Sequence, residues 1–186
     1  MPNSKSLLAI LNSRPIWFAL SQIATPLRLR AGLWQYQAKI QFVERLPIPD
    51  LTADQESQLA EQAEAITALA RSRYALDEAM RGRIAADLGA DSKLNDKLGE
   101  WWRLPNVSEL RAEVKKAFKR DIPLAERDDW SKYLTDQRAK HESLTAQIVA
   151  LETQVNAVVY AAFDLTPDEI GLIERATKYP LSLIHI

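Results

Sequence analysis

Residues 125–162 read AERDDWSKYLTDQRAKHESLTAQIVALETQVNAVVYAA, and this stretch decides the fold. Its seam positions recur at alternating steps of four and three over several heptads, a spacing typical of a coiled-coil helix. The seam consists of Trp130, Leu134, Gln137, His141, Leu144, Ile148, Leu151, Val155, Val158 and Ala162. We therefore predict one long helix from about Ala125 to Ala162, with Leu151 buried in its seam.

A second long helix precedes this one and supplies a partner for the seam. Thr52 and Gln55 have the spacing of a capping box, in which two residues exchange hydrogen bonds at a helix start. The segment that follows is rich in alanine and glutamate, and Gly89 is well placed to end it. Its apolar stripe is Leu59, Ile66, Leu69, Leu76, Met80, Ile84 and Leu88. The matching lengths predict antiparallel pairing of the two helices.

Two shorter helices are indicated by their caps. In the aromatic-rich connection between the long helices, Asn106 and Glu109 cap a helix whose apolar face is Leu110, Val114 and Phe118. After the second long helix, Thr166-Pro-Asp-Glu169 combines an N-cap threonine, a proline at the first position and a glutamate at the third. This pattern predicts a terminal helix.

The first 50 residues predict a small mixed lobe. Apolar residues recur at helical spacing from Leu7 to Gln22, with an interruption near Arg14-Pro15. Pro26 and Gly32 bracket a passage that we expect to be rich in turns. From Leu33 to Val43 the apolar residues alternate with polar ones, which predicts a strand.

These elements give a mainly α fold: a small mixed α/β N-terminal lobe, a long antiparallel helical hairpin of coiled-coil type, and a short terminal helix. We expect the lobe to span residues 1–50, the hairpin with its connection 51–165, and the terminal helix 166–180. Residues 181–186, LSLIHI, resemble the translation of a transposon end used in sequencing libraries. We expect them to be a non-native tail, on a fragment truncated at its C-terminus and at its N-terminus.

Composition excludes several classes of protein. The chain has 186 residues, no Cys and two His, so disulfide scaffolds, thiolate metal sites and a Cys nucleophile are absent. With 47% hydrophobic residues it is not typical of a disordered chain, and it has no apolar run near the ~20 residues that cross a bilayer. Residues 1–49 carry a net charge of +5, against −6 for the remainder. This asymmetry is typical of a polyanion-facing lobe, and equally of an ordinary solvated surface.

The usual catalytic motifs are missing. The sequence has no Gly-rich phosphate loop, no G-x-S-x-G and no H-E-x-x-H. The carboxylate pairs fall at helix starts, where the helix dipole already explains them. His141 lies in the coiled-coil seam, where a polar residue sets register more often than it binds a ligand. Trp101 and Trp102 suit a hydrophobic plug better than a platform for stacking bases.

The passage from Thr25 to Arg45 has a different character. It combines four cationic residues with aromatic residues and glutamines around turns and a strand. Cations neutralise phosphates, glutamine addresses base edges and aromatic rings stack. The DNA-contact candidates are Arg28, Arg30, Trp34, Gln35, Tyr36 and Lys39.

A family resemblance sharpens this interpretation. LLAILNSRPIWFALSQ at 7–22 and TPLRLRAGLWQYQAKIQFVERLPIPDLT at 25–52 resemble the C-terminal specificity region of type II restriction–modification adenine-specific DNA methyltransferases. The stretches EWWRLPNVSELRAEVKKAFKRDIPLAERDDW and NAVVYAAFDLTPDEIGLIE are similar to the tail of these enzymes. The resemblance extends over residues 6–179, and the six candidates above match its recognition segment.

The resemblance implies a parent enzyme that transfers a methyl group from S-adenosylmethionine to the N6 atom of adenine in double-stranded DNA. The N-P-P-[YF] signature and the cofactor loop of such enzymes do not occur in this sequence. We therefore expect no catalytic, cofactor-binding or metal-binding residues here, and a methyltransferase core upstream on the parent chain. Whether the parent also cleaves DNA stays open.

One alternative function also stays open. The chain suits a non-catalytic helical scaffold or a detached specificity subunit, whose long helices recruit a partner and whose basic face is incidental. We expect a cytoplasmic location and no membrane association, because the sequence has no secretory signal and the implied substrate is DNA.

Overall fold

The computed structural model describes residues 3–30, 33–37, 39–89 and 93–177. The fold is mainly α, as predicted, with one two-stranded antiparallel sheet in the described ranges. The chain divides into two compact units: unit 1 comprises residues 1–68 and 148–186, and unit 2 comprises residues 69–147. The two long helices contribute residues to both units. The predicted tail 181–186 and the end of the predicted terminal helix lie outside the described residues.

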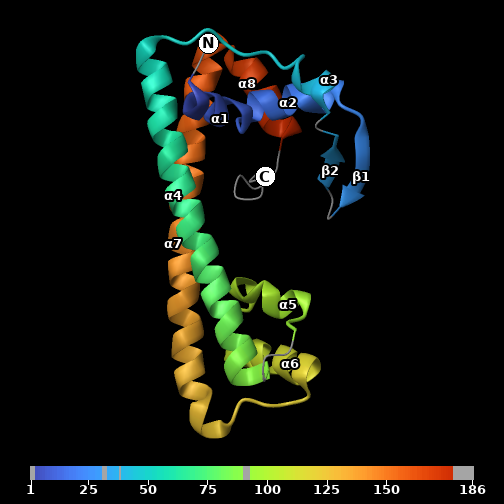
Figure 1. Cartoon of the computed structure of the whole chain (residues 1–186), viewed down its shortest axis with the longest axis vertical. Helices are drawn as coiled ribbons and strands as arrows, with labels where there is room; N and C mark the ends of the chain where they lie inside the picture. The colour runs from blue at the N-terminus through green and yellow to red at the C-terminus, as the bar shows by residue number, and fades with distance from the viewer. Residues whose placement is uncertain (1–2, 31–32, 38, 90–92, 178–186) are drawn as a thin grey trace. The chain divides into compact units, whose positions relative to one another are not determined.

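The two long helices have the predicted bounds. Helix α4 (Ala53–Arg83) continues through a π-helical turn, η1 (Ile84–Leu88), to Gly89 (Figure 1). Helix α7 (Arg127–Ala162) follows a short 3-10 turn, η3 (Leu124–Glu126). The capping box forms at the start of α4, because Thr52 Oγ1 accepts from Gln55 N and Gln55 Oε1 accepts from Thr52 N.

Contacts within unit 2 confirm the antiparallel pairing of α4 with α7. Arg73 Nη1 donates to Thr145 Oγ1 at 3.3 Å, and one turn later on α4 the Asp77 carboxylate lies beside His141, one turn earlier on α7. Positions therefore rise along α4 while they fall along α7. The seam is not uniformly buried, however. Leu151 is half-buried rather than buried as expected, because apolar positions at heptad spacing drift around a straight helix.

The core of unit 1 joins the long helices to the N-terminal helices. Helices α1 (Ser4–Leu11) and α2 (Arg14–Ile23) are separated at Asn12-Ser13, which confirms the predicted interruption. Helix α8 (Pro167–Ala176) starts with the complete capping box predicted at Thr166 and Glu169. The buried cluster consists of Ala9, Ile10, Ile16, Leu59, Ala63, Val155 and Val159.

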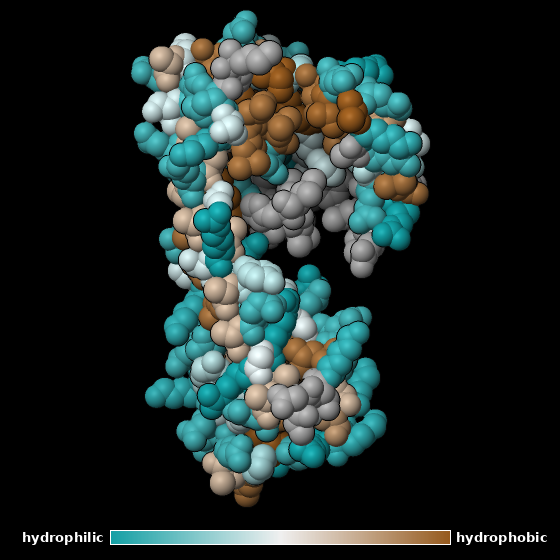
Figure 2. Space-filling view, viewed as in Figure 1, coloured by the Kyte–Doolittle hydropathy of each residue, from teal (hydrophilic) through white to brown (hydrophobic). Residues whose placement is uncertain are grey.

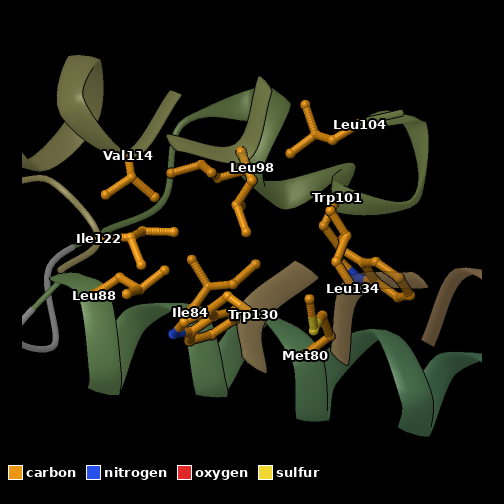
Figure 3. Packing of buried hydrophobic residues seen from close by; sticks show 11 residues of the cluster. Met80, Ile84, Leu88, Leu98, Trp101, Leu104, Val114, Ile122, Trp130 and Leu134 are labelled. Atoms are coloured by element: carbon orange, nitrogen blue, oxygen red, sulfur yellow. The ribbon is translucent and has the colours of Figure 1, made fainter. Parts of the chain in front are cut away.

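The core of unit 2 forms where the aromatic-rich connection folds onto the long helices. The connection contains α5 (Asp96–Gly99), η2 (Trp101–Arg103) and α6 (Val107–Phe118). Figure 3 shows Trp101 beside Leu134 and Met80, and its side chain is fully buried. The plug interpretation of Trp101 is therefore correct. At Gly89 a Cβ atom would lie 2.8 Å from the Phe118 ring, so a larger residue there would force that ring to shift.

The sheet corrects two predictions about the lobe. Pro26–Arg30 forms strand β1, although we expected turns, and strand β2 is only Leu33–Tyr36. The predicted strand end, Ile40–Val43, is instead the short helix α3. Pro26 pairs with Tyr36, and Gln37 N still donates to the Thr25 carbonyl at 3.2 Å. The neighbouring chain before this point is the end of α2, so later residues have no strand to pair with. Gly32 and Ala38 lie outside the described residues.

No helix in the described ranges is both long and apolar enough to span a membrane.

Candidate nucleic-acid interface

The β1–β2 hairpin carries most of the predicted DNA contacts. Arg28 pairs with Gln35 in the ladder, and its Nε donates to Gln35 Oε1 at 2.7 Å. Arg30 pairs with Leu33, and Trp34 with Leu29. The side chains of Arg30 and Trp34 lie outside the described part of the structure. The ladder therefore brings Arg28 and Gln35 together. The glutamine that orients the Arg28 side chain is uncharged, so the positive charge of Arg28 is not neutralised by this contact.

Three exposed cations between residues 28 and 45 form no ion pair with a carboxylate in the described ranges, whereas Lys5 near the N-terminus pairs with Glu64. Arg28, Lys39 and Arg45 are exposed, and none forms an ion pair within the described ranges. Glu44 is the only acidic residue among residues 1–49. An unpaired exposed guanidinium or ammonium group keeps its full charge for a phosphate, so the lobe presents a positive surface.

The hairpin rests on a helix that is firmly anchored within unit 1. The Tyr36 ring meets the Trp17 ring of α2 edge-on, with ring centroids 6.0 Å apart. Arg14, at the start of α2, is buried: its backbone N donates to Asn156 Oδ1 at 2.8 Å, and its Nη1 donates to the Thr177 carbonyl at 2.6 Å. Nη1 also lies 3.1 Å from Glu174 Oε2. Sequence reasoning missed this network, because its members are 142 to 163 residues apart.

An apolar cleft of about 310 Å³ also lies in unit 1. It is lined by Pro15, Phe18, Ala19, Pro47, Phe163, Leu165, Glu169, Leu172 and Ile173. Figure 2 shows hydrophobic residues gathered over this part of unit 1, near α2 and α8. Glu169 is its only charged wall residue, and its carboxylate is engaged by Thr166 in the capping box, which lowers its pKa.

In unit 2, the seam residue His141 packs against an aromatic ring and lies near a carboxylate. The His141 ring stacks on Trp102 at 4.8 Å with 11° between the planes, and Asp77 Oδ1 lies 3.7 Å from His141 Nε2. Burial lowers the pKa of His141, with a smaller contribution from Arg73. Burial likewise raises the pKa of Asp77. Trp102 thus covers a histidine and is not a free stacking platform.

We expect His141 to make unfolding pH-dependent. The pKa of His141 in the folded state lies below its value of about 6.5 in the unfolded state. The contribution of the neutral His141 to the unfolding free energy is therefore complete above pH 6.5, and it is lost as the pH falls through the folded-state pKa. Lowering the pH from 7.5 to 5.5 should therefore reduce the unfolding free energy of the wild type relative to that of His141→Gln, measured by urea titration. Asp77 acts with the opposite sign, but it is present in both proteins. An equal pH dependence of the two proteins would contradict this assignment.

The described ranges contain no group of three or more His, Cys, Asp or Glu side chains arranged to hold a metal ion.

Comparison with known proteins places the chain in one family. The model of a family described as a domain of unknown function, DUF8810, matches residues 52–159. Because this match covers more than half of the 186 residues, the chain belongs to that family. The matched range includes α4, α5 and α6 and ends within α7, and it leaves out the β1–β2 hairpin. No curated protein and no solved structure matches the chain.

Proposed function

For this member of a family of unknown function, we propose that the chain is the DNA-recognition and spacer part of a site-specific adenine-N6 DNA methyltransferase of a type II restriction–modification system. The methyltransferase core of the parent enzyme lies upstream in this proposal. Cytoplasmic location belongs to the same proposal, because the substrate is cellular DNA.

The exposed cations Arg28, Lys39 and Arg45, which form no ion pair in the described ranges, carry this proposal. Phosphate contacts position a protein on a duplex, and base contacts then select the sequence. Arg28 and Lys39 supply the first kind of contact. Gln35 carries an amide on the adjacent strand and suits the second kind of contact, whereas the Tyr36 ring packs against Trp17 on the opposite face of the strand. Anchoring through Arg14 and Trp17 limits the entropy that the hairpin loses when it binds.

The paired helices suit the spacer part of the proposal. Helix α4 has 31 residues, which corresponds to about 46 Å at 1.5 Å per residue. Within each unit, apolar side chains of α4 are buried together with apolar side chains of α7. A long helix that is paired in this way suits the spacer role in this proposal.

The described residues do not fit S-adenosylmethionine. The cleft of unit 1 is apolar, and its one carboxylate is engaged at a helix start. It has no free charged groups for the amino and carboxylate ends of this cofactor. We therefore derive no step of methyl transfer from this chain.

The charge of the hairpin gives the test of this function. Duplex DNA binding by the full chain should weaken with salt, and Arg28→Ala/Arg30→Ala should flatten the slope of log K against log[salt] by about 0.9 for each lost phosphate contact. Fluorescence anisotropy with a labelled duplex at several salt concentrations measures this slope. The double variant Lys132→Ala/Lys140→Ala removes the same charge from exposed positions on α7 and serves as the control. An unchanged slope in the hairpin variant would refute the assignment.

The apolar cleft favours the scaffold as a second candidate function. Leu172 in its wall is 51% exposed, as expected of a surface that docks an apolar partner. The scaffold would be supported over DNA recognition by two results together: oligomers that form through the long helices, and a DNA affinity that does not change when the hairpin arginines are replaced by alanine.

A further inference from the structure

A cluster of cationic residues lies at the end of helix α6, and the function proposed above assigns it no role. Residues 111–120 hold five Lys or Arg residues against Glu113 alone, a net charge of +4 within ten residues. The N-terminal lobe needs 49 residues to reach +5. We name the cluster the α6 basic surface; it consists of Arg111, Lys115, Lys116, Lys119, Arg120 and Arg127.

Three of these cations converge on one carboxylate. Arg111 binds Asp121 through two hydrogen bonds of 3.0 and 2.9 Å, and Lys115 and Arg127 lie 3.1 and 3.2 Å from Asp121 Oδ2. Hydrogen bonding from Arg111 holds the pKa of Asp121 well below its usual range, so the carboxylate stays ionised. One negative charge is thus shared among three positive ones. Two positive charges remain in excess, on side chains whose positions are already constrained.

The other three cations are still less neutralised. Lys116 Nζ is 4.0 Å from Glu113, whose carboxylate is also paired with Lys97 at 3.0 Å. Lys119 Nζ donates only to the Lys116 carbonyl within the described ranges, which leaves two of its three ammonium hydrogens for another acceptor. Arg120 is exposed and has no hydrogen bond or ion pair in the same ranges.

The backbone at Lys119 is an independent sign of function. Lys119 ends α6 in the left-handed conformation, with φ 57° and ψ 27°. Glycine is the usual residue at this position, because a Cβ atom is unfavourable there. A lysine at a position where glycine is more stable indicates that its side chain is used.

Helix electrostatics account for only part of the cluster. Cations in the last turn of a helix interact favourably with its dipole, which explains Lys115 and Lys116. The effect fades beyond the last turn, so it does not explain Arg120 or Arg127. Acidic residues at the start of α7, Asp128 and Asp129, are explained by the dipole of that helix.

We propose that the α6 basic surface binds the phosphate backbone of double-stranded DNA. The inference rests on the proposed function for the identity of the polyanion, and it makes the helical hairpin a second contact surface as well as a spacer. Arg guanidinium groups match phosphate oxygens in pairs, and one carboxylate, Asp121, neutralises only part of the charge of the three cations around it. The surface lies within the range matched by the family, whereas the β1–β2 hairpin does not.

The first test compares two triple variants of the full chain. Lys116→Gln/Lys119→Gln/Arg120→Gln should flatten the salt slope of binding to a labelled duplex by up to about 2.7, or 0.9 for each contact. Arg71→Gln/Lys132→Gln/Lys140→Gln removes the same charge from exposed positions of unit 2 and should change the slope by less than one contact. Equal changes in the two variants would overturn the proposal.

The second test separates the role of Lys119 in binding from its role in folding. Lys119→Gly should raise the thermal midpoint by about 2–4 °C, because it relieves the left-handed backbone. The same variant should weaken DNA binding. A variant that is more stable and binds equally well would contradict a contact at Lys119.

A gain of affinity completes the test. Asp121→Asn removes the carboxylate that competes with phosphate for Arg111, Lys115 and Arg127, so affinity for the duplex should rise. Asp136→Asn makes the same charge change at an exposed position of α7 and is the control. Equal gains in the two variants would count against the proposal.

The outcomes distinguish failure of this inference from failure of the proposed function. If the hairpin variant flattens the slope and the α6 variant does not, the inference fails and the function stands. If only the α6 variant flattens it, the inference stands and the hairpin assignment fails. If the wild type does not bind duplex DNA at low salt, both fail.

Discussion

Replacing Trp101 by alanine is expected to lower the unfolding free energy by about 3–5 kcal/mol, the range for removing a buried large aromatic side chain. Trp101 is 0% exposed and lies in the cluster that joins the connection to both long helices (Figure 3). The cavity left behind would be bounded by residues of paired helices, which limits how far it can collapse. Urea unfolding followed by far-ultraviolet circular dichroism measures the change.

The adjacent tryptophan provides a matched control. Trp102 has the same side chain but is only half-buried, so Trp102→Ala should cost clearly less than Trp101→Ala. Trp101→Phe should also cost less, because it retains much of the buried area and removes an indole N–H that has no acceptor in the described ranges. Equal losses for Trp101→Ala and Trp102→Ala would mean that Trp101 is not the plug.

The second large effect is expected at Leu59 on α4. Leu59 is 0% exposed and belongs to the cluster that contains Val155 and Val159 of α7. Leu59→Ala should therefore lower the unfolding free energy by about 2–5 kcal/mol. The comparison is Leu151→Ala, which removes the same atoms from a half-buried position of α7 and should cost less. Chemical denaturation of both variants under one condition gives the difference directly.

The order of these two losses tests the helix pairing. If Leu151→Ala lowers the unfolding free energy as much as Leu59→Ala does, then Leu151 is buried in the α7 seam, as the heptad pattern alone predicts. A loss below about 0.5 kcal/mol for Leu59→Ala would be typical of a solvated single helix and would contradict the pairing.

The two basic surfaces differ in how visible they are in the sequence. The cations of the N-terminal lobe stand out, because only Glu44 opposes them. Those of α6 are diluted by acidic residues on both sides of residues 111–120. Asp121 comes after Lys119 and Arg120, beyond the end of α6 at Phe118, and only folding brings Arg111, Lys115 and Arg127 around it.

The sequence by itself determined the two long helices and the two shorter helices that start at caps, α6 and α8, because helix starts and ends depend on local chemistry. The capping residues Thr52, Asn106 and Thr166 lie within three residues of their hydrogen-bond partners, so each start was readable in advance. Gly89 likewise marked the end of the first long helix.

Only the tertiary structure decided features that depend on distant partners. The strand predicted up to Val43 ends at Tyr36, since a strand extends only as far as its neighbour supplies hydrogen bonds. Leucine and arginine alternate in Pro26–Arg30, which is typical of a strand. The nearby Pro26 and Gly32 favoured turns, so we expected turns there instead. Arg14 finds Asn156 and Thr177, and Asp121 collects three cations, because packing brings together groups whose separation along the chain gives no local signal.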